Sequence, residues 1–254
     1  MPNDKVDEFL ALEPARPHVV TLICDDIQLH RAAQRNVTAM EFAGVSSQRD
    51  DAIAVTEMDA DAVLLPKVNS PADLDALADI TGELPIWAMM ESPRGMLNAP
   101  AIAAHPKLTG MVMGTNDLAK ELQSRFRADR LPMQTSLGLC LLAAKAEGLT
   151  IVDGVYNAFK DDEGLKVECE QGRDMGFDGK TLIHPAQVAV CNEAFAPSEA
   201  EVDLAKRQIA AFEQAEAEGQ GVAVVDGKIV ENLHIVTAKK ILAQAEAIEA
   251  LAAE

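Results

Sequence analysis

Positive charge is scarce in this chain of 254 residues. Lys and Arg number 22 against 41 Asp and Glu, and the formal net charge at pH 7 is −19 with neutral histidine. Because nucleic-acid binding needs clustered Lys and Arg to neutralise phosphates, this balance argues against a nucleic-acid partner. It argues equally against docking on anionic membranes. An anionic ligand would need a local group of cations, backbone amides or a metal ion.

Long apolar runs and closely spaced cysteines are also missing. The first residues, MPNDKVDEFLALEP, contain neither the basic nor the apolar segment of a secretion signal. The longest strongly apolar run, 137–144, is far shorter than the roughly 20 residues of a membrane helix. No CxxC pair or Cys/His cluster is present, which argues against zinc and disulfide frameworks. The four cysteines are Cys24, Cys140, Cys169 and Cys191. We therefore expect a soluble, cytoplasmic protein with reduced cysteines.

Strand-length apolar runs recur between helical stretches. They lack strict alternation, as expected for parallel strands buried on both faces. Their starts are about 25 to 40 residues apart, which leaves one helix in each gap. The expected strands are 62–68, 85–90, 110–114, 150–156 and 180–185. This pattern predicts an α/β fold, and the length suits either one large α/β barrel or two small domains.

Helix and turn signals divide the rest of the chain. Ser70-Pro71-Ala72-Asp73 has the residues of a helix start, and Gly148 those of the end of a helix over 135–147. After a helix over 187–195, the rhythm stops. A capping box at Ser198 predicts a helix over 199–218, and Asp226-Gly227 predicts a hairpin turn before a last helix over 235–252. Upstream, we expect a strand at 18–24, a helix at 28–39 and a strand at 40–45.

Two carboxylates follow neighbouring expected strands. Glu91 stands directly after one strand, and Asp117 stands three residues after the next. Because consecutive parallel strands usually lie side by side, both side chains would meet at one edge of the sheet. Two carboxylates with open positions suit Mg²⁺ or Mn²⁺. The alternative is two unrelated acids that each stabilise a helix start.

Three further places could carry chemistry. The loop that ends at Asp117 has a glycine and backbone amides that could cradle a carboxylate, or it is an ordinary turn. Its residues are Gly114, Thr115, Asn116 and Asp117. His184-Pro185 ends another strand at the same edge, and a packed, hydrogen-bonded histidine is the alternative to a catalytic one. By local chemistry alone, Asp226 is a turn residue.

Several segments resemble the citrate lyase β-subunit-like (HpcH/HpaI aldolase) superfamily. They are VLLPKV, IWAMMESPRGMLNAPAIAAHPKLTGMVMGTNDLAKEL, GLTIVDGVYNAF, GFDGKTLIHPAQV and VVDGKIVENLHIVTA. Within this superfamily, they are most similar to bacterial enzymes that act on malyl-CoA. The resemblance covers roughly residues 55 to 250 and is dense.

The resemblance implies a TIM (β/α)₈-type barrel with a C-terminal helix–hairpin–helix extension, assembled as homotrimers or homohexamers. It implies Mg²⁺ on Glu91 and Asp117, with the substrate carboxylate near the loop 114–117. Asp226 matches an acid that a neighbouring subunit's lid supplies for proton transfer. His184-Pro185 matches a loop on the coenzyme A side.

The implied activity is hydrolysis of (3S)-malyl-CoA to malate and CoA, which we favour, or its cleavage to acetyl-CoA and glyoxylate. Two alternatives stay open. One is a catalytically impaired remnant or assembly subunit of the family. The other is an aldolase that acts on a small α-keto acid without CoA.

The N-terminal part departs from the family pattern. Relatives carry strands resembling LYIPG and LEDAV and an Arg-x-Asn motif, and none of these is visible before residue 55. No catalytic arginine can therefore be assigned. We expect a barrel domain over 1–196, with 1–54 atypical and the barrel incomplete there, and an extension over 197–254. We attribute the atypical segment to a truncated or frame-disrupted reading of the gene, in preference to a divergent protein.

Overall fold

The structure, a computed structural model, describes residues 18–21, 36–39, 52–53, 55–56 and 60–252. The described residues form two compact units, one up to Ala194 and one from Phe195 onward. This division lies within two residues of the boundary drawn from the sequence between 196 and 197.

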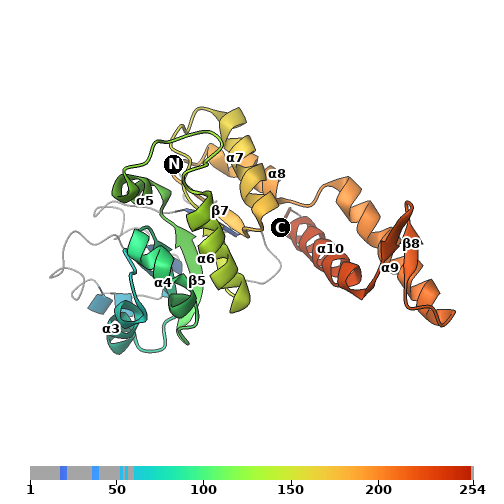
Figure 1. Cartoon of the computed structure of the whole chain (residues 1–254), viewed down its shortest axis with the longest axis horizontal. Coiled ribbons are helices and arrows are strands. Elements are labelled where there is room, and N and C mark those ends of the chain that lie inside the picture. Colours follow the sequence, from blue (N-terminus) through green and yellow to red (C-terminus); the bar gives the residue numbers. More distant parts are fainter. Residues whose placement is uncertain (1–17, 22–35, 40–51, 54, 57–59, 253–254) are drawn as a thin grey trace. The chain divides into compact units, whose positions relative to one another are not determined.

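The first unit is built on a seven-stranded parallel sheet with the order β1-β7-β6-β5-β4-β3-β2. Figure 1 labels β5 and β7 of this sheet. The strands are β1 (His18–Thr21), β2 (Asn36–Ala39), β3 (Ala60–Leu65), β4 (Ile86–Met90), β5 (Leu108–Met113), β6 (Thr150–Asp153) and β7 (Gly179–Leu182). From β2 to β7, each strand pairs with the next along the chain. The first described strand, β1, pairs with β7 and not with β2. First and last strands lie side by side when a sheet curls into a barrel, so the pairing confirms the barrel-type α/β fold.

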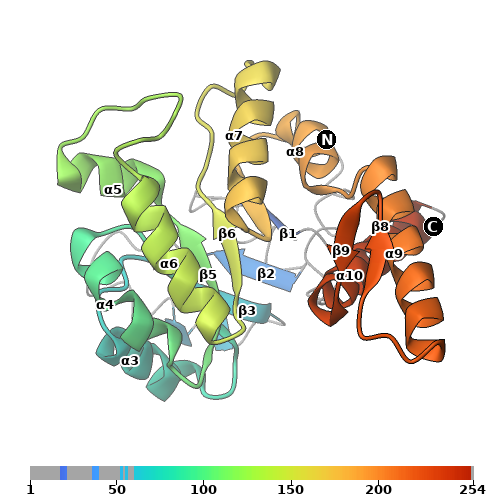
Figure 2. The ribbon, with the colours of Figure 1, turned by 45° about the vertical axis from the view of Figure 1, so that its right-hand side comes forward.

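Helices follow the strands in the expected rhythm. They are α3 (Pro71–Thr81), α4 (Pro93–Ala103), α5 (Thr115–Leu122), α6 (Gln134–Ala146), α7 (Asp162–Met175) and α8 (Gln187–Phe195). Figure 2 shows α4 and α6 side by side, and both contact β5. At the start of α3, the Asp73 carboxylate accepts the backbone N–H of Ser70 at 2.8 Å, as the capping signal predicts. Gly148 follows α6 with φ of 71°, a conformation that glycine adopts without strain.

Alternate residues on neighbouring strands form a buried cluster on one face of the sheet. Its members are Ala62, Leu64, Trp87, Val112 and Val152. The Trp87 ring fits because residue 110 is glycine: a Cβ there would lie 2.5 Å from the ring. Strand neighbours that project the same way fill the interior of a barrel sheet, and their burial contributes about 25 cal/mol per Å² of apolar surface.

The second unit is a helix–hairpin–helix. Its elements are α9 (Glu199–Ala217), β8 (Ala223–Val225), β9 (Lys228–Val230) and α10 (Asn232–Ala252). Both turn residues, Asp226 and Gly227, have positive φ (51° and 74°), which matches the twist of a two-residue hairpin turn. Val225 and Val230 are buried with Phe212 of α9, so one hairpin face is packed on the helix. The expected capping box of Ser198 and Glu201 is also present.

One upstream expectation is wrong. Residues 36–39, expected to end a helix, form strand β2, which pairs with β3. Val37 and Thr38 are β-branched and fit a strand, and the partner strand overrides the weak helical pattern. The rest of that expected helix, 28–35, and the expected strand 40–45 lie outside the described residues. β1 covers 18–21 of the expected strand 18–24. Among the described residues, no helix is long and apolar enough to cross a membrane.

Candidate active site

Glu91 and Asp117 meet at the carboxyl edge of the sheet. β4 pairs with β5 as far as Met90 and Met113, and the Gly114 N–H continues the ladder by donating to the Met90 carbonyl at 2.8 Å. Glu91 then follows β4, and Asp117 lies in the first turn of α5. Lys67 contacts both carboxylates, through its backbone N–H to Glu91 and its Nζ to Asp117. The predicted convergence of the two acids is therefore present in the fold.

Gly114 makes this approach possible. A Cβ at residue 114 would collide with the Glu91 Cβ and would lie 2.8 Å from its Oε2. Glu91 is only 9% exposed, which agrees with this close approach. A glycine after the strand is thus required by the close packing of Glu91, a reason that the sequence alone did not give.

Lys67 is a site residue that the sequence did not single out. Its backbone N–H donates to Glu91 Oε1 at 2.8 Å, and its Nζ donates to Asp117 Oδ2 at 2.6 Å. This hydrogen bond is the main cause that raises the pKa of Lys67 and lowers the pKa of Asp117. Its position in the sequence could have revealed it, because Lys67 lies two residues after β3, the strand that pairs with β4.

The loop that carries Lys67 is fastened to the start of α4. Ser92 Oγ donates to Asn69 Oδ1 at 2.5 Å, and Asn98 Nδ2 donates to the Asn69 carbonyl at 2.7 Å. Asn69 in turn donates its Nδ2 to the Lys67 carbonyl at 2.7 Å. These contacts fix the backbone that presents the Lys67 amide to Glu91.

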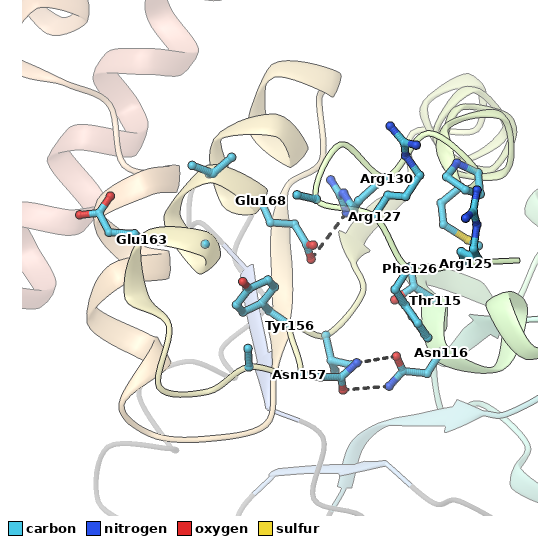
Figure 3. Close-up of a pocket in the computed structure, with 17 residues that line it drawn as sticks. Thr115, Asn116, Arg125, Phe126, Arg127, Arg130, Tyr156, Asn157, Glu163 and Glu168 are labelled. Carbon is cyan, nitrogen blue, oxygen red and sulfur yellow. Dashed lines mark hydrogen bonds and ion pairs between the residues drawn. The ribbon is translucent and has the colours of Figure 1, made fainter.

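Thr115 and Asn116 are held against the segment after β6. Asn116 and Asn157 exchange amide hydrogen bonds of 3.1 and 2.7 Å, and Figure 3 shows the two side chains facing each other. A Cβ at Gly154 would lie 2.5 Å from Thr115 Oγ1, so this packing also depends on a glycine. The loop 114–117 is consequently braced on both sides, by Glu91 and by the segment after β6.

A cavity of about 650 Å³ lies beside this loop (Figure 3). Thr115 and Asn116 line it together with apolar and aromatic side chains and with arginines of the segment between α5 and α6. Its other lining residues include Arg125, Phe126, Arg127, Arg130, Val155, Tyr156, Val167 and Glu168. The Tyr156 hydroxyl donates to Asp161 at 2.7 Å, the main cause that raises its pKa to about 12. The cavity therefore adjoins the site with a largely apolar wall.

Four charged side chains form a largely buried cluster, and two of them, Arg130 and Glu168, also line this cavity. Arg130 Nη1 lies 2.6 Å from Asp153 Oδ2, and Lys180 Nζ lies 2.6 Å from Glu168 Oε1 and 3.3 Å from Asp153 Oδ2. Burial alone would raise the pKa of Asp153, but Lys180 and Arg130 outweigh burial and hold it below its ordinary value. Burial likewise opposes the charge of Lys180, and Asp153 and Glu168 overcome it and raise its pKa. We name these four residues the sealed cluster.

His184 and Pro185 lie on the exposed loop after β7. The Phe159 ring stacks on the His184 ring with centroids 4.9 Å apart, and Lys160 Nζ is 5.5 Å from the Phe159 centroid. The Gln187 side chain accepts the His184 backbone N–H at 3.2 Å and so shapes the loop. The role of His184 stays a prediction.

Asp226 occupies the hairpin tip of the second unit. Arg207 of α9 donates from Nη1 to both carboxyl oxygens of Asp226 at 2.8 Å. This contact was not foreseen from the sequence, because the two residues belong to different elements. The role of Asp226 in proton transfer also stays a prediction.

The donor set fits a hard divalent cation. Glu91 and Asp117 offer carboxylate oxygens on adjacent strand ends, and the ammonium of Lys67 on Asp117 shows that this place favours positive charge. Among the described residues, no group of three His, Cys, Asp or Glu could hold a metal ion. Mg²⁺ commonly keeps several waters and needs only one or two protein carboxylates, so the pair suffices.

Comparison with known proteins assigns the chain to a family. Residues 13–185 match the model of the HpcH/HpaI aldolase/citrate lyase family, and residues 133–248 match a model of C–C bond lyases of the TIM-barrel fold. The resemblance seen in the sequence motifs starts near residue 55. The family match begins further upstream, at residue 13.

Individual relatives agree with this match. A (3S)-malyl-CoA thioesterase of Cereibacter sphaeroides is 66% identical over 221 residues, which cover 86% of this chain and 78% of the relative. The citrate lyase subunit beta of Escherichia coli is 35% identical over 213 residues, covering 78% and 69%.

A solved structure is similar too. The CitE protein of Mycobacterium tuberculosis, crystallised with magnesium, acetoacetate and coenzyme A, has a TM-score of 0.74 and 30% identity. The similarity covers 84% of this chain and 79% of that one. Sequence motifs, sheet topology and these matches agree, and the chain belongs to the HpcH/HpaI aldolase/citrate lyase family.

Proposed function

We propose that this chain is a Mg²⁺-dependent enzyme that hydrolyses (3S)-malyl-CoA to malate and CoA. The observation that carries the proposal is the pairing of Glu91 and Asp117 on adjacent strand ends in a chain 66% identical to a (3S)-malyl-CoA thioesterase. The CitE structure with magnesium and coenzyme A supports the same cofactor and the same class of thioester ligand.

Glu91 and Asp117 would hold the metal ion, whose bound charge polarises an oxygen of the α-hydroxy acid. The first backbone N–H groups of α5, around Thr115 and Asn116, lack partners within the helix and can therefore bind an anion. We assign them to the malyl carboxylate. The braces at Gly154 and Asn157 keep this loop in place before the ligand arrives.

The remaining assignments complete the site. We assign the exposed loop with His184 and Pro185 to the coenzyme A side, where stacked Phe159 and the nearby Lys160 offer an aromatic surface and a cation. We assign Asp226 to proton transfer, delivered by a neighbouring copy in a homotrimer or homohexamer. Cys140, Cys169 and Cys191 are free and buried. Free thiols suit a reducing compartment, and we propose the cytoplasm.

A second candidate is cleavage of malyl-CoA to acetyl-CoA and glyoxylate. Two observations favour it: residues 133–248 match the model of C–C bond lyases, and the Escherichia coli citrate lyase subunit beta is 35% identical. Both reactions begin from the same bound α-hydroxy thioester, so Glu91 and Asp117 do not separate them.

One assay separates the candidates. Purified full-length protein is incubated with malyl-CoA and Mg²⁺, and free thiol and glyoxylate are followed separately. Thiol and malate without glyoxylate are expected for the thioesterase, whereas glyoxylate with intact acetyl-CoA would replace it by the lyase. Absence of both products with Mg²⁺ still bound would point to the impaired family member. Cleavage of a CoA-free hydroxy-keto acid in a parallel reaction would point to the aldolase.

Mixed variants test the place of Asp226. Glu91→Gln and Asp226→Asn subunits are each expected to be inactive alone. Co-refolded together, they are expected to recover activity, because some sites then combine an intact Glu91 with an intact Asp226 from a neighbour. No recovery in mixed oligomers of verified composition would contradict an acid supplied between subunits.

A further inference from the structure

Lys67 contacts both carboxylates of the proposed metal pair through different atoms. The backbone N–H reaches Glu91 Oε1 at 2.8 Å, and the side-chain Nζ reaches Asp117 Oδ2 at 2.6 Å. One residue therefore connects two acids that lie on different strand ends. Without a cation between them, two carboxylates that contact the same residue would repel each other.

The backbone of Lys67 adopts an unusual conformation to make these contacts. Its φ is 53°, in the left-handed region that side chains with a Cβ rarely enter. Such a conformation persists only where the surroundings hold it, and it is found preferentially at functional sites. Here the Glu91 carboxylate and the Asn69 side chain hold the amide and the carbonyl of Lys67.

The side chain of Lys67, in contrast, is reached by water. It is 56% exposed, and Asp117 is 30% exposed, so water contacts both partners of the ion pair. An exposed ion pair of this kind is weak, because water competes for both partners. We therefore expect the backbone contact with Glu91 to persist and the side-chain contact with Asp117 to be easily broken.

We propose that the ammonium of Lys67 is a displaceable substitute for the divalent cation, while its backbone amide is a fixed support for Glu91. In the metal-free protein, the ammonium neutralises Asp117 and keeps the two carboxylates together. A divalent ion that binds Asp117 takes over its oxygens and repels the ammonium, which moves into water. This inference rests on the proposed metal site, although not on the identity of the thioester.

The inference predicts an effect opposite to that of an ordinary structural ion pair. If the ammonium competes with the metal, its removal tightens metal binding, because nothing has to be displaced. If it only supports the fold of the site, its removal loosens the carboxylates and weakens metal binding. The sign of the change in affinity decides between them.

Mn²⁺ binding to the full-length protein, followed by calorimetry and by electron paramagnetic resonance, tests this sign. Lys67→Met and Lys67→Gln remove the charge and keep the backbone N–H. We expect each to lower the Mn²⁺ Kd about two- to fivefold, the range of an exposed ion pair. Lys67→Arg keeps a cation and is expected to stay within about twofold of the original chain.

Lys120→Met is the matched control. Lys120 is an exposed lysine of α5 that acts on Asp117 through space and has no hydrogen bond to it. Removing it changes the local charge equally, and we expect less than a twofold change in Kd. The thermal midpoint gives a second readout: metal-free Lys67→Met should melt lower than the original chain and gain more from Mn²⁺.

The outcomes separate this inference from the proposed function. Equal or weaker Mn²⁺ binding by both folded neutral variants, with normal binding by the original chain, overturns the role of Lys67 alone. An affinity gain as large in Lys120→Met overturns it as well. Absence of Mn²⁺ binding in every chain overturns the metal site and this inference together. Tighter binding without malyl-CoA hydrolysis supports the inference and removes only the thioester assignment.

Discussion

The first unit contains two groups of opposite charges that differ in access to water. The open cluster, Glu91, Asp117 and Lys67, lies at the strand ends, and its ammonium is 56% exposed. The sealed cluster contains two acids and two cations, Asp153, Glu168, Arg130 and Lys180, with Asp153 and Lys180 at 0% exposure. The formal charges of the sealed cluster cancel, whereas the open cluster has one negative charge in excess.

The difference in exposure indicates which of the two clusters can bind a metal ion. Charges inside a protein must be balanced and hydrogen-bonded, because an uncompensated buried ion is strongly destabilising. The formal charges of the sealed cluster are balanced, although Arg130 Nη2 is buried without a hydrogen-bond partner in the described part of the chain. The ion pair of the open cluster is reached by water, with Lys67 56% and Asp117 30% exposed, so its ammonium can exchange with another cation.

Breaking the open cluster should produce the largest functional effect. Glu91→Gln and Asp117→Asn each remove one proposed metal ligand, and we expect Mg²⁺-dependent turnover of malyl-CoA to fall about a thousandfold or more. Steady-state assays across a Mg²⁺ titration measure the loss. Glu121→Gln, an exposed acid near Lys67, is the control and should retain most activity. Undiminished turnover in either ligand variant would refute the metal assignment.

Breaking the sealed cluster should affect stability instead. Lys180→Met leaves Asp153 and Glu168 short of a buried partner, and we expect the free energy of unfolding to fall by about 3–5 kcal/mol. Lys145→Met removes a lysine from a partly exposed pair with Asp178 and should cost no more than about 1 kcal/mol. Urea unfolding at pH 7 compares the two. Similar losses would show that burial of the sealed cluster is not the deciding factor.

Closing the space beside Glu91 should have an intermediate effect. Gly114→Ala puts a methyl group onto the Glu91 side chain, and we expect a loss of about 1–3 kcal/mol with weaker Mn²⁺ binding. Gly138→Ala is the control, because a Cβ there meets nothing within 4 Å inside α6. It should stabilise the helix by about 0.5–1 kcal/mol. Calorimetric melting and Mn²⁺ titration measure the stability and the metal affinity of both variants. If Gly114→Ala keeps the stability and Mn²⁺ affinity of the original chain, the close approach of Gly114 and Glu91 is excluded.

The pH dependence of stability should show a smaller effect, which comes from the charges of the sealed cluster. The pKa of Asp153 is held below 3.8, so its contribution to stability is complete above that value and is lost as pH falls below it. The pKa of Lys180 is raised above 10.5, and its contribution is lost only as pH rises beyond that value. We expect the stability gap between the original chain and Asp153→Asn to be constant from pH 5 to pH 9 and to narrow by pH 3. Urea unfolding across this range measures it, and a gap that widens in acid would reverse the assigned direction.

Much of the fold follows from short segments of the sequence. The strands β3 to β7, the start of α3 and the hairpin of the second unit were predicted, because apolar periodicity, capping residues and the Asp226-Gly227 turn act over a few residues. The meeting of Glu91 and Asp117 was also predicted, since neighbouring parallel strands place their carboxyl ends together. Strand β2 was not, because a four-residue strand with little pattern of its own depends on its pairing partner.

The sequence by itself determined the rhythm of strands and helices and the two acids that follow adjacent strands, whereas the contact of Gly114 with Glu91 came from the fold. Only the tertiary structure decided that β1 lies against β7, that Asn116 is bound to Asn157, and that Lys67 joins both acids. These features connect residues far apart in the chain, or require a lysine with a left-handed backbone conformation. Local sequence preferences select neither the long-range contacts nor this conformation. Local propensities thus specify the elements, while long-range packing specifies which charges share a partner and which stay open to a metal.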